Sequence, residues 1–141
     1  ASEFLERFKG NGELPMITSC SSAWMKYAEQ FQADLLDNIS TCKSPMSMLG
    51  SVLKTYFPEK IGKETKDIFS AAVMCCTAKK YEAAREELQL EGNVRGVDLV
   101  VTTREIAWMI KSAGIDLLNI EPEPFDSPLG ISSGAGAIFG T

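Results

Sequence analysis

The sequence contains no histidine, and this absence excludes several kinds of active site. Histidine-based proton shuttles, Ser-His-Asp triads and most zinc sites cannot be built from this chain alone. The sequence also has no apolar run near the roughly 20 residues that would span a bilayer. Residues 1–8 alternate charged and apolar side chains, without the basic start and long apolar stretch of a signal peptide. We therefore expect a cytoplasmic protein with no membrane span.

Positive charge is scarce and scattered along the chain. The 14 Lys and Arg residues are outnumbered by 19 Asp and Glu residues, which gives a formal net charge of -5. Because the basic residues occur singly or in pairs, they form no patch of the kind that binds a phosphate backbone, and nucleic acid is not an expected partner. The length of 141 residues and a hydrophobic fraction of 45% fit a single globular lobe over residues 1–141.

Apolar runs alternate with amphipathic stretches along the chain. Three runs have the length and composition of buried strands: residues 14–18, 67–74 and 97–101. The stretches between them show helical periodicity. Strands that alternate with helices favour a parallel sheet covered by those helices. We therefore predict an α/β fold, a three-layer lobe with a mostly parallel sheet and helices on both faces.

Several residues mark where the predicted helices begin and end. Ser44 followed by Pro45 is typical of an N-cap and the first residue of a helix, and we expect that helix to end at Pro58. Residues 79–90 are charged and rich in helix formers. Residues 102–105, TTRE, have the spacing of a capping box and predict another helix start.

The four cysteines are the main candidates for chemistry. Without a secretory signal, thiolate chemistry with iron, or plain buried thiols, fits this count better than disulfides. Cys20, Cys75 and Cys76 each follow a predicted strand, and ligands bind at the carboxyl ends of parallel strands. We therefore expect Cys20 and Cys76 to lie close together and Cys42 to lie apart. A single thiol is more often structural than a ligand, so an α/β domain with structural thiols is an alternative.

Two charged residues that follow Cys76 have alternative interpretations. Lys79 is either a solvated lysine at a helix start or, at the edge of an apolar site, a cation that holds an anionic ligand. Glu82 is more typical of a surface glutamate or a partner of Lys79 than of a catalytic acid. The sequence alone does not decide between these roles for Lys79 and for Glu82. It contains no P-loop and no dinucleotide-binding signature.

Two motifs resemble the signatures of the [FeFe]-hydrogenases. Residues 18–24, TSCSSAW, are similar to the first signature, T-S-C-C-P-x-W, and residues 74–82, MCCTAKKYE, to the second, M-P-C-x-x-K-x-x-E. Three more segments match the family in the same order: residues 40–45, 101–105 and 133–140. The resemblance covers nearly the whole chain. It implies a fragment of a catalytic domain whose parent enzyme reversibly reduces protons to H₂, with a ferredoxin or another iron–sulfur protein as electron carrier.

The resemblance also implies a cofactor, the H-cluster of the parent enzyme. In this family a [4Fe-4S] cubane is joined through a cysteine to a diiron unit that carries CO, cyanide and a dithiolate bridge. By the match, Cys76 and Ser21 stand at cubane-ligand positions, and Lys79 would donate a hydrogen bond to a cyanide. The residues that would line the diiron pocket are Met74, Pro45 and Phe139. By the same match Cys20 would relay a proton to the bridging group.

A proton relay would continue outward from Cys20. Ser40 and Glu3 stand at spacings that match the family's relay positions, so the resemblance assigns this role to them. These two residues complete the expected set of functional side chains in the chain.

Three residues depart from the signatures. Ser21 stands where the first cubane cysteine is expected, Ser22 where a proline follows it, and Cys75 where the second signature has proline. A serine oxygen is a poorer iron–sulfur ligand than a thiolate. The third signature, E-x-M-x-C-x-x-G-C, would belong to the remaining part of the hydrogenase chain, so we expect this chain alone to bind no complete cluster and to be inactive.

These departures favour an alternative from another class, a hydrogenase-like iron–sulfur scaffold, assembly or sensor protein. Lys79 and the TSC segment at residues 18–20 favour the enzyme.

Overall fold

A computed structural model describes residues 1–10, 12–126 and 128 of the chain. The α-helices of this part are α1 (Ser2–Lys9), α2 (Ser22–Phe31), α3 (Pro45–Ile61), α4 (Ala78–Ala84) and α5 (Thr103–Ser112). Short 3₁₀ helices are η1 (Ala33–Asn38), η2 (Thr65–Asp67), η3 (Glu86–Leu88) and η4 (Leu117–Asn119). The strands are β1 (Ala71–Met74) and β2 (Leu99–Thr102).

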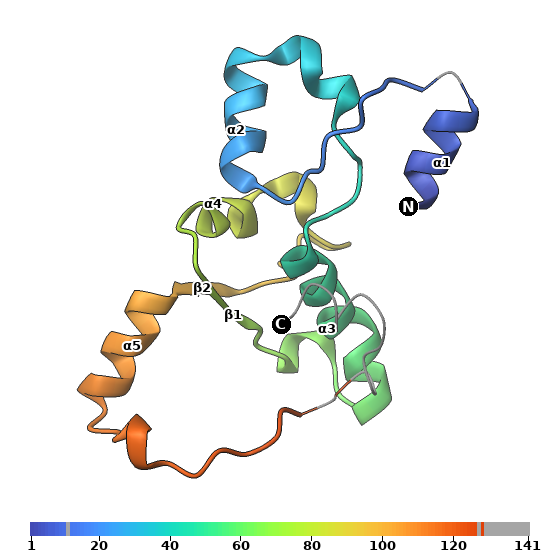
Figure 1. The fold of residues 1–141 in the computed structure, drawn as a ribbon. Helices are drawn as coiled ribbons and strands as arrows, with labels where there is room; N and C mark the ends of the chain where they lie inside the picture. The colour runs from blue at the N-terminus through green and yellow to red at the C-terminus, as the bar shows by residue number, and fades with distance from the viewer. Residues whose placement is uncertain (11, 127, 129–141) are drawn as a thin grey trace.

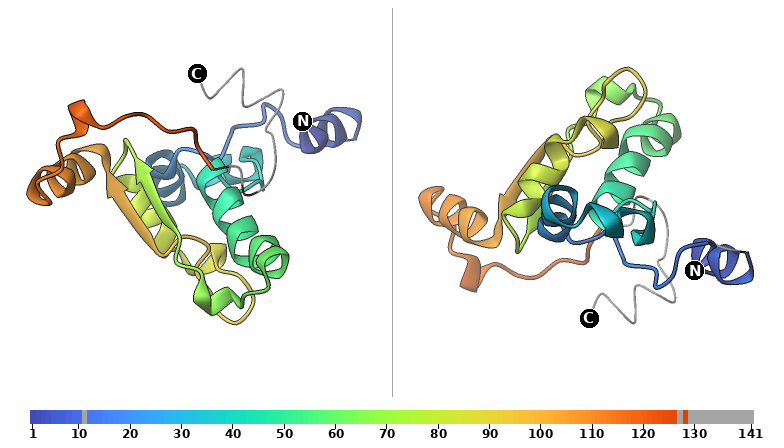
Figure 2. Two further views of the ribbon diagram at one scale, coloured as in Figure 1. Left: turned by 90° about the horizontal axis from the view of Figure 1, so that it is seen from below. Right: turned by 90° about the horizontal axis from the view of Figure 1, so that it is seen from above.

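The two strands form a parallel pair at the centre of the molecule. Ala71 lies opposite Leu99, and Met74 lies opposite Thr102. A parallel pair needs a crossover connection, and α4 lies within that connection. Figure 1 shows the pair in the middle, with α2 and α4 above it, α3 to the right and α5 to the left. Seen from above in Figure 2, α4 and α2 lie over the strands. The predicted α/β fold, with helices packed around a parallel sheet, is confirmed.

The strand predicted at residues 14–18 is wrong. Only Ile17 pairs, as an isolated parallel bridge to Ile39: its amide donates to the Asn38 carbonyl at 2.8 Å, and its carbonyl accepts from the Ser40 amide at 2.7 Å. Pro15 has no N–H to donate to a ladder, which limits how far pairing can extend along this short segment.

Two other predicted elements are shorter than expected. Residues 67–74 contribute only their second half to the sheet: Asp67 ends η2, which is fixed by a capping box between Glu64 and Asp67, and β1 begins only at Ala71. The helix predicted over residues 79–90 ends at Ala84 and is followed by η3. Helix-forming residues favour both α-helix and 3₁₀ helix, so their pattern does not distinguish one long α-helix from a shorter one followed by a 3₁₀ turn.

Two predicted helix starts are confirmed. At the start of α3 the Ser44 hydroxyl accepts a hydrogen bond from the Ser47 amide at 3.3 Å, and Pro45 is the first helical residue. At the start of α5 the Thr102 hydroxyl accepts from the Glu105 amide at 3.2 Å, while the Glu105 carboxylate accepts from the Thr102 amide at 2.7 Å. Each bond satisfies an amide that the first helical turn leaves without a partner.

The predicted end of α3 at Pro58 is wrong, because the helix continues to Ile61 and ends at Gly62 in the left-handed conformation, with φ of 65°. A proline inside a helix leaves the carbonyl four residues earlier without its amide donor. Here that carbonyl belongs to Lys54, and the Thr65 hydroxyl donates to it at 2.9 Å. The donor comes from η2, beyond the helix, so the helical sequence itself did not reveal it.

We expect Thr65→Val to lower the free energy of unfolding by about 1–2 kcal/mol, because it removes the donor to this carbonyl. Thr55→Val is the matched control. The Thr55 hydroxyl also donates to a carbonyl, that of Ser51 at 2.9 Å, but this carbonyl lies within the regular hydrogen-bond ladder of α3. Urea unfolding of both variants measures the difference. Equal losses would contradict this explanation of how α3 passes Pro58.

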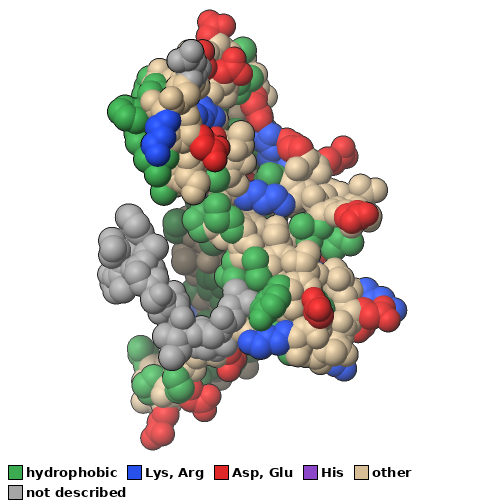
Figure 3. Space-filling model, turned by 90° about the vertical axis from the view of Figure 1, so that its right-hand side faces the viewer, with side chains coloured by type: hydrophobic (Ala, Val, Ile, Leu, Met, Phe, Trp, Pro, Cys, Tyr) green, Lys and Arg blue, Asp and Glu red, His purple; other side chains and the backbone are tan. Residues whose placement is uncertain are grey.

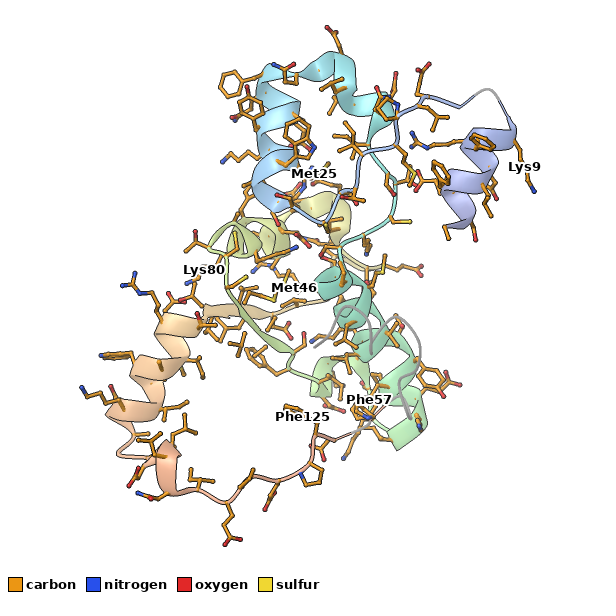
Figure 4. All side chains as sticks on the ribbon, viewed as in Figure 1. Lys9, Met25, Met46, Phe57, Lys80 and Phe125 are labelled. Atoms are coloured by element: carbon orange, nitrogen blue, oxygen red, sulfur yellow. The ribbon has the colours of Figure 1, made fainter. Side chains whose placement is uncertain are left out.

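The core lies where α3, α4 and the strands meet. Its buried members are Met46, Val97 and Val100, with Ala72, Met74 and Ala83 packed against them. Figure 4 labels Met46 at the start of α3, close to the strands. Close approach of α3 requires glycine at position 50, since a Cβ there would lie 2.6 Å from Val97 Cγ2.

Candidate functional site

The two cysteine-bearing segments meet at the carboxyl end of β1. Cys75 and Cys76 follow the strand directly, and the Lys79 amide donates to the Cys76 carbonyl at 3.3 Å as α4 begins. The Lys79 ammonium donates to the Cys20 carbonyl at 2.7 Å, across 59 positions of sequence. Lys79 therefore joins the segment that contains Cys20 to the segment that contains Cys76, although of these two cysteines only Cys76 follows a strand.

All four cysteines are free and exposed. The Cys20 thiol donates to the Thr18 hydroxyl at 3.8 Å. The Ser19 hydroxyl donates to the Cys42 carbonyl, so the backbone at Cys42 lies beside residues 18–20, while the separation of its thiol from the other thiols stays a prediction. Its thiol donates to a Glu3 carboxylate oxygen at 3.6 Å.

A buried polar cluster lies directly behind this edge. The Lys79 ammonium and the Glu82 carboxylate form an ion pair at 2.7 Å, and the two residues are only 8% and 4% exposed. Glu82 Oε1 accepts from the hydroxyls of Ser44 and Ser47, and Oε2 accepts from Ser22 as well as from Lys79. We call these five residues the Glu82 cluster. Lys79 is thus not a solvated lysine, and Glu82 is its buried partner.

The pKa of Glu82 reflects two opposed effects. Burial opposes ionisation and raises the pKa, whereas the hydrogen bonds from Lys79 and from the three serine hydroxyls lower it. The hydrogen bonds prevail, so the pKa lies below its ordinary value of 4.5. Glu82 is therefore a carboxylate at neutral pH, which suits a structural anion rather than a catalytic acid.

The predicted relay residues Glu3 and Ser40 lie in contact. The Ser40 hydroxyl donates to Glu3 at 2.5 Å, the Thr41 amide at 3.0 Å and the Arg7 guanidinium at 2.8 Å. The Ser40 and Thr41 hydrogen bonds are the main reasons that the pKa of Glu3 falls to about 2. Glu3 is therefore ionised at neutral pH, where its carboxylate accepts hydrogen bonds from these donors.

Arg7 was missed in the sequence. Besides Glu3 it donates to the carbonyls of Asp37 at 2.7 Å and Ile39 at 2.9 Å, so it ties α1 to the end of η1. The four-residue spacing from Glu3 was the available signal, since such pairs face each other on a helix. The hydrogen bonds of the three serines to Glu82 were missed too, and no local pattern marks these contacts.

Met74 and Pro45 line one apolar cavity of about 410 Å³, as their expected roles in one pocket require. The cavity lies between the start of α3 and β1, with Leu49 and Leu53 on its helical side. Phe139, the third residue expected in that pocket, lies outside the described residues.

The side chain expected to be a second cubane ligand, Ser21, lies at the start of α2. It caps the helix by accepting from the Trp24 amide at 3.4 Å, and it is exposed. Within residues 1–10, 12–126 and 128, no three His, Cys, Asp or Glu side chains gather closely enough to hold a metal ion. These residues therefore do not form a complete ligand set for a metal cluster.

The distribution of charged side chains and the length of the apolar helices are two further features of the described residues. On the face shown in Figure 3 the basic side chains are dispersed among acidic ones. In the part of the chain that the structure describes, no helix is long and apolar enough to cross a membrane.

Comparison with known proteins finds relatives along the whole chain. The family "Iron only hydrogenase large subunit, C-terminal domain" matches residues 1–141. Iron hydrogenase 1 of Clostridium pasteurianum is 44% identical over 140 residues, which are 99% of this chain and 24% of that protein. The periplasmic [Fe] hydrogenase large subunit of Nitratidesulfovibrio vulgaris is 45% identical over 141 residues, 99% of this chain and 33% of that protein. Cytosolic iron-sulfur assembly component 3 of Bos taurus is 37% identical over 131 residues, 89% of this chain and 28% of that protein.

Solved structures agree with these relatives. A variant of [FeFe]-hydrogenase HydA1 from Chlamydomonas reinhardtii matches with a TM-score of 0.87 and 37% identity, over 96% of this chain and 34% of that one. HydA(deltaEFG), from a study of stepwise H-cluster assembly, matches with a TM-score of 0.86 and 38% identity, over 96% and 34%. The chain thus spans about a quarter to a third of the length of the hydrogenases it matches.

Proposed function

The chain belongs to the iron-only hydrogenase large-subunit family, and we propose that it forms part of the catalytic domain of an [FeFe]-hydrogenase. In this proposal the whole polypeptide reversibly reduces protons to H₂ at an H-cluster. One observation carries the proposal. Lys79 joins Cys20 and the segment after Cys76 at the carboxyl end of a parallel strand, the edge at which such sheets bind ligands.

The residues of this chain do not fit a complete H-cluster by themselves. A cubane is usually held by four thiolates, and the described residues gather no such set. Cys76 and Ser21 would supply two ligands, and the remaining part of the hydrogenase chain would supply the others.

The other predicted residues keep roles that suit their surroundings. Lys79 is a buried cation at the site edge, where it would hold an anionic ligand such as cyanide. Met74 and Pro45 would line the pocket of the diiron unit, with Phe139 as the third expected member. Their shared apolar cavity supports this assignment.

We also propose a proton relay from Glu3 through Ser40 to Cys20, the residues to which the resemblance assigns this role. The contact of Glu3 with the Ser40 hydroxyl supports its outer half. The Ser40 amide donates to the Ile17 carbonyl at 2.7 Å, three positions before Cys20, which brings the two halves into neighbouring segments.

A ferredoxin or another iron–sulfur protein is the proposed electron carrier. A cytoplasmic location stays a prediction, because the relatives include both a periplasmic hydrogenase and a cytosolic assembly component.

A second candidate function is iron–sulfur assembly. The assembly components match at 36% to 38% identity, below the 44% to 45% of the hydrogenases. Ser21 and Cys75 favour this alternative, since both replace residues of the hydrogenase signatures. An assembly protein would need a bound cubane but neither a diiron unit nor a proton relay.

Anaerobic reconstitution with iron, sulfide and a synthetic diiron complex tests the proposal in two arms. We expect the full polypeptide that carries this segment to show protein-bound CO and cyanide bands in the infrared and to evolve H₂. The chain of 141 residues alone should show neither, because its ligand set is incomplete.

Three other outcomes decide against this account. A full polypeptide that binds a cubane without infrared bands or H₂ supports the assembly function instead. A full polypeptide that binds no iron rejects both functions. Turnover by the 141-residue chain alone would contradict the incomplete ligand set.

A further inference from the structure

Ser22 stands at the proline position of the first signature, and its hydroxyl is a group that proline cannot supply. It is the first residue of α2 and is only 4% exposed. Its hydroxyl donates to Glu82 Oε2, 60 positions away in the sequence. The hydrogen bond therefore joins the start of α2 to α4.

Ser22 shares its acceptor atom with Lys79. The two carboxylate oxygens of Glu82 divide their donors: Ser44 and Ser47 donate to Oε1, and Ser22 and Lys79 donate to Oε2. Because Ser44 and Ser47 donate only to the first oxygen, Ser22 is the hydroxyl that fixes the oxygen to which the Lys79 ammonium is bonded.

The same contacts close a ring of interactions. The Lys79 ammonium donates to Glu82 at 2.7 Å and to the Cys20 carbonyl at 2.7 Å, and Cys20 lies two positions before Ser22 on the same segment. Glu82 thus binds the segment through Ser22, and Lys79 binds it through Cys20. Charge-assisted hydrogen bonds of this kind are stronger than neutral ones and fix their partners in one geometry.

We propose that Ser22 is a positioning residue for Lys79: its hydroxyl orients the Glu82 carboxylate so that the ammonium stays at the Cys20 carbonyl. The inference deepens the proposed function, because Lys79 is the cation expected to meet an anionic ligand at this edge. It does not depend on a bound cluster, since every contact that carries it lies within this chain.

The test is amine acylation of the full polypeptide without cluster, read out by mass spectrometry as the ratio of modified Lys79 to modified Lys80. Lys80 is the internal reference: its side chain is 44% exposed, and it pairs with Glu105 on the outer side of α4 (Figure 4). Three variants are compared, Ser22→Pro, Ser22→Ala and Ser22→Thr. Proline is well accepted as the first residue of a helix, so Ser22→Pro removes the hydroxyl while α2 keeps its start.

We expect the ratio to rise about three- to tenfold in Ser22→Pro and Ser22→Ala, because one bond to a buried charged group is lost. Ser22→Thr restores the hydroxyl and should keep the ratio near that of the unchanged protein. Ser112→Ala, at the exposed end of α5, is the control for a substitution away from the cluster.

Two results would overturn the proposal. One is an unchanged ratio in folded Ser22→Pro and Ser22→Ala proteins. The other is a rise of the same size in Ser22→Thr or Ser112→Ala, which would indicate general loosening rather than positioning. Neither result bears on cluster binding, so this failure is distinct from failure of the proposed function, which the reconstitution detects.

Discussion

Glu82→Gln is expected to lower the free energy of unfolding by about 3–5 kcal/mol at pH 7. The substitution keeps the shape of the side chain but leaves the ammonium of Lys79 buried without its counter-charge, and breaking one partner of a buried ion pair costs that much. The glutamine amide also carries an N–H₂ group, which would point at Lys79 or at the serine hydroxyls. Those groups already donate to this side chain, so a donor would face a donor. Urea unfolding at neutral pH measures the loss.

Glu64→Gln is the matched control for this change. Glu64 forms an ion pair with Lys66 at 2.6 Å, but the two side chains are 70% and 75% exposed. An exposed pair contributes between zero and about 1 kcal/mol, and glutamine keeps an oxygen for the cap of η2. A loss in Glu82→Gln no larger than that in Glu64→Gln would mean that the Glu82 cluster does not stabilise the fold.

The pH dependence of the Glu82→Gln effect follows from the direction of the pKa. The pKa of Glu82 lies below its ordinary value of 4.5, so its contribution to stability is fully present above that value and is lost as the pH falls through the folded pKa. The difference between the two proteins should therefore shrink when the pH falls from 7 to below 4.5. Glu3 and Glu105, each with a pKa of about 2, titrate in both proteins and cancel in the comparison.

The sequence predicted those elements whose signals are local. Ser44 and Thr102 cap their helices because the partner amides lie three residues away, within the same motif. The parallel pairing of β1 and β2 followed from the strand, helix and strand order, which leaves few other arrangements.

The errors arose where distant residues decide the local structure. Pro58 did not end α3, because Thr65 supplies the missing donor from outside the helix. Residues 14–18 looked like a strand by composition, yet a single bridge to Ile39 is all that forms. A periodic pattern gives no information about which partner is available in space.

In the candidate site, too, local signals could be read from the sequence and contacts between distant residues could not. The motifs and the strand pattern predicted that Cys20 and Cys76 would lie close together; Lys79 joins their segments, and the closeness of the two thiols stays a prediction. The hydroxyls of Ser22 and Ser44 could not be foreseen, since they reach Glu82 across 60 and 38 positions. Helix α5 gives a further case: Ile106, Met109 and Ile110 recur with helical periodicity, but Met109 is 46% exposed, and the pattern does not say what would cover it.

Cys76→Ala in the full polypeptide is expected to abolish binding of the cubane, whereas Cys75→Ala should retain it. Both thiols are free, exposed and adjacent at the end of β1, so burial and strand position do not distinguish them. Only the signature does, because Cys76 matches the ligand cysteine and Cys75 matches a proline. Loss of a thiolate ligand leaves an open iron that is prone to dissociate. Iron and acid-labile sulfide content after anaerobic reconstitution measures the loss.

The pair of variants separates ligation from two other roles for these thiols. If the thiols are structural, neither substitution changes iron content, and both change only the free energy of unfolding. If Cys75 is the ligand instead, the two results exchange, and the alignment of the second signature with residues 74–82 is displaced by one position. Ser21→Cys adds a third measurement: it restores a thiolate at the first cubane position and should raise retention of the cubane, because a thiolate binds iron–sulfur clusters better than a serine oxygen does. Unchanged retention would mean that the Ser21 position, which here caps α2, supplies no ligand.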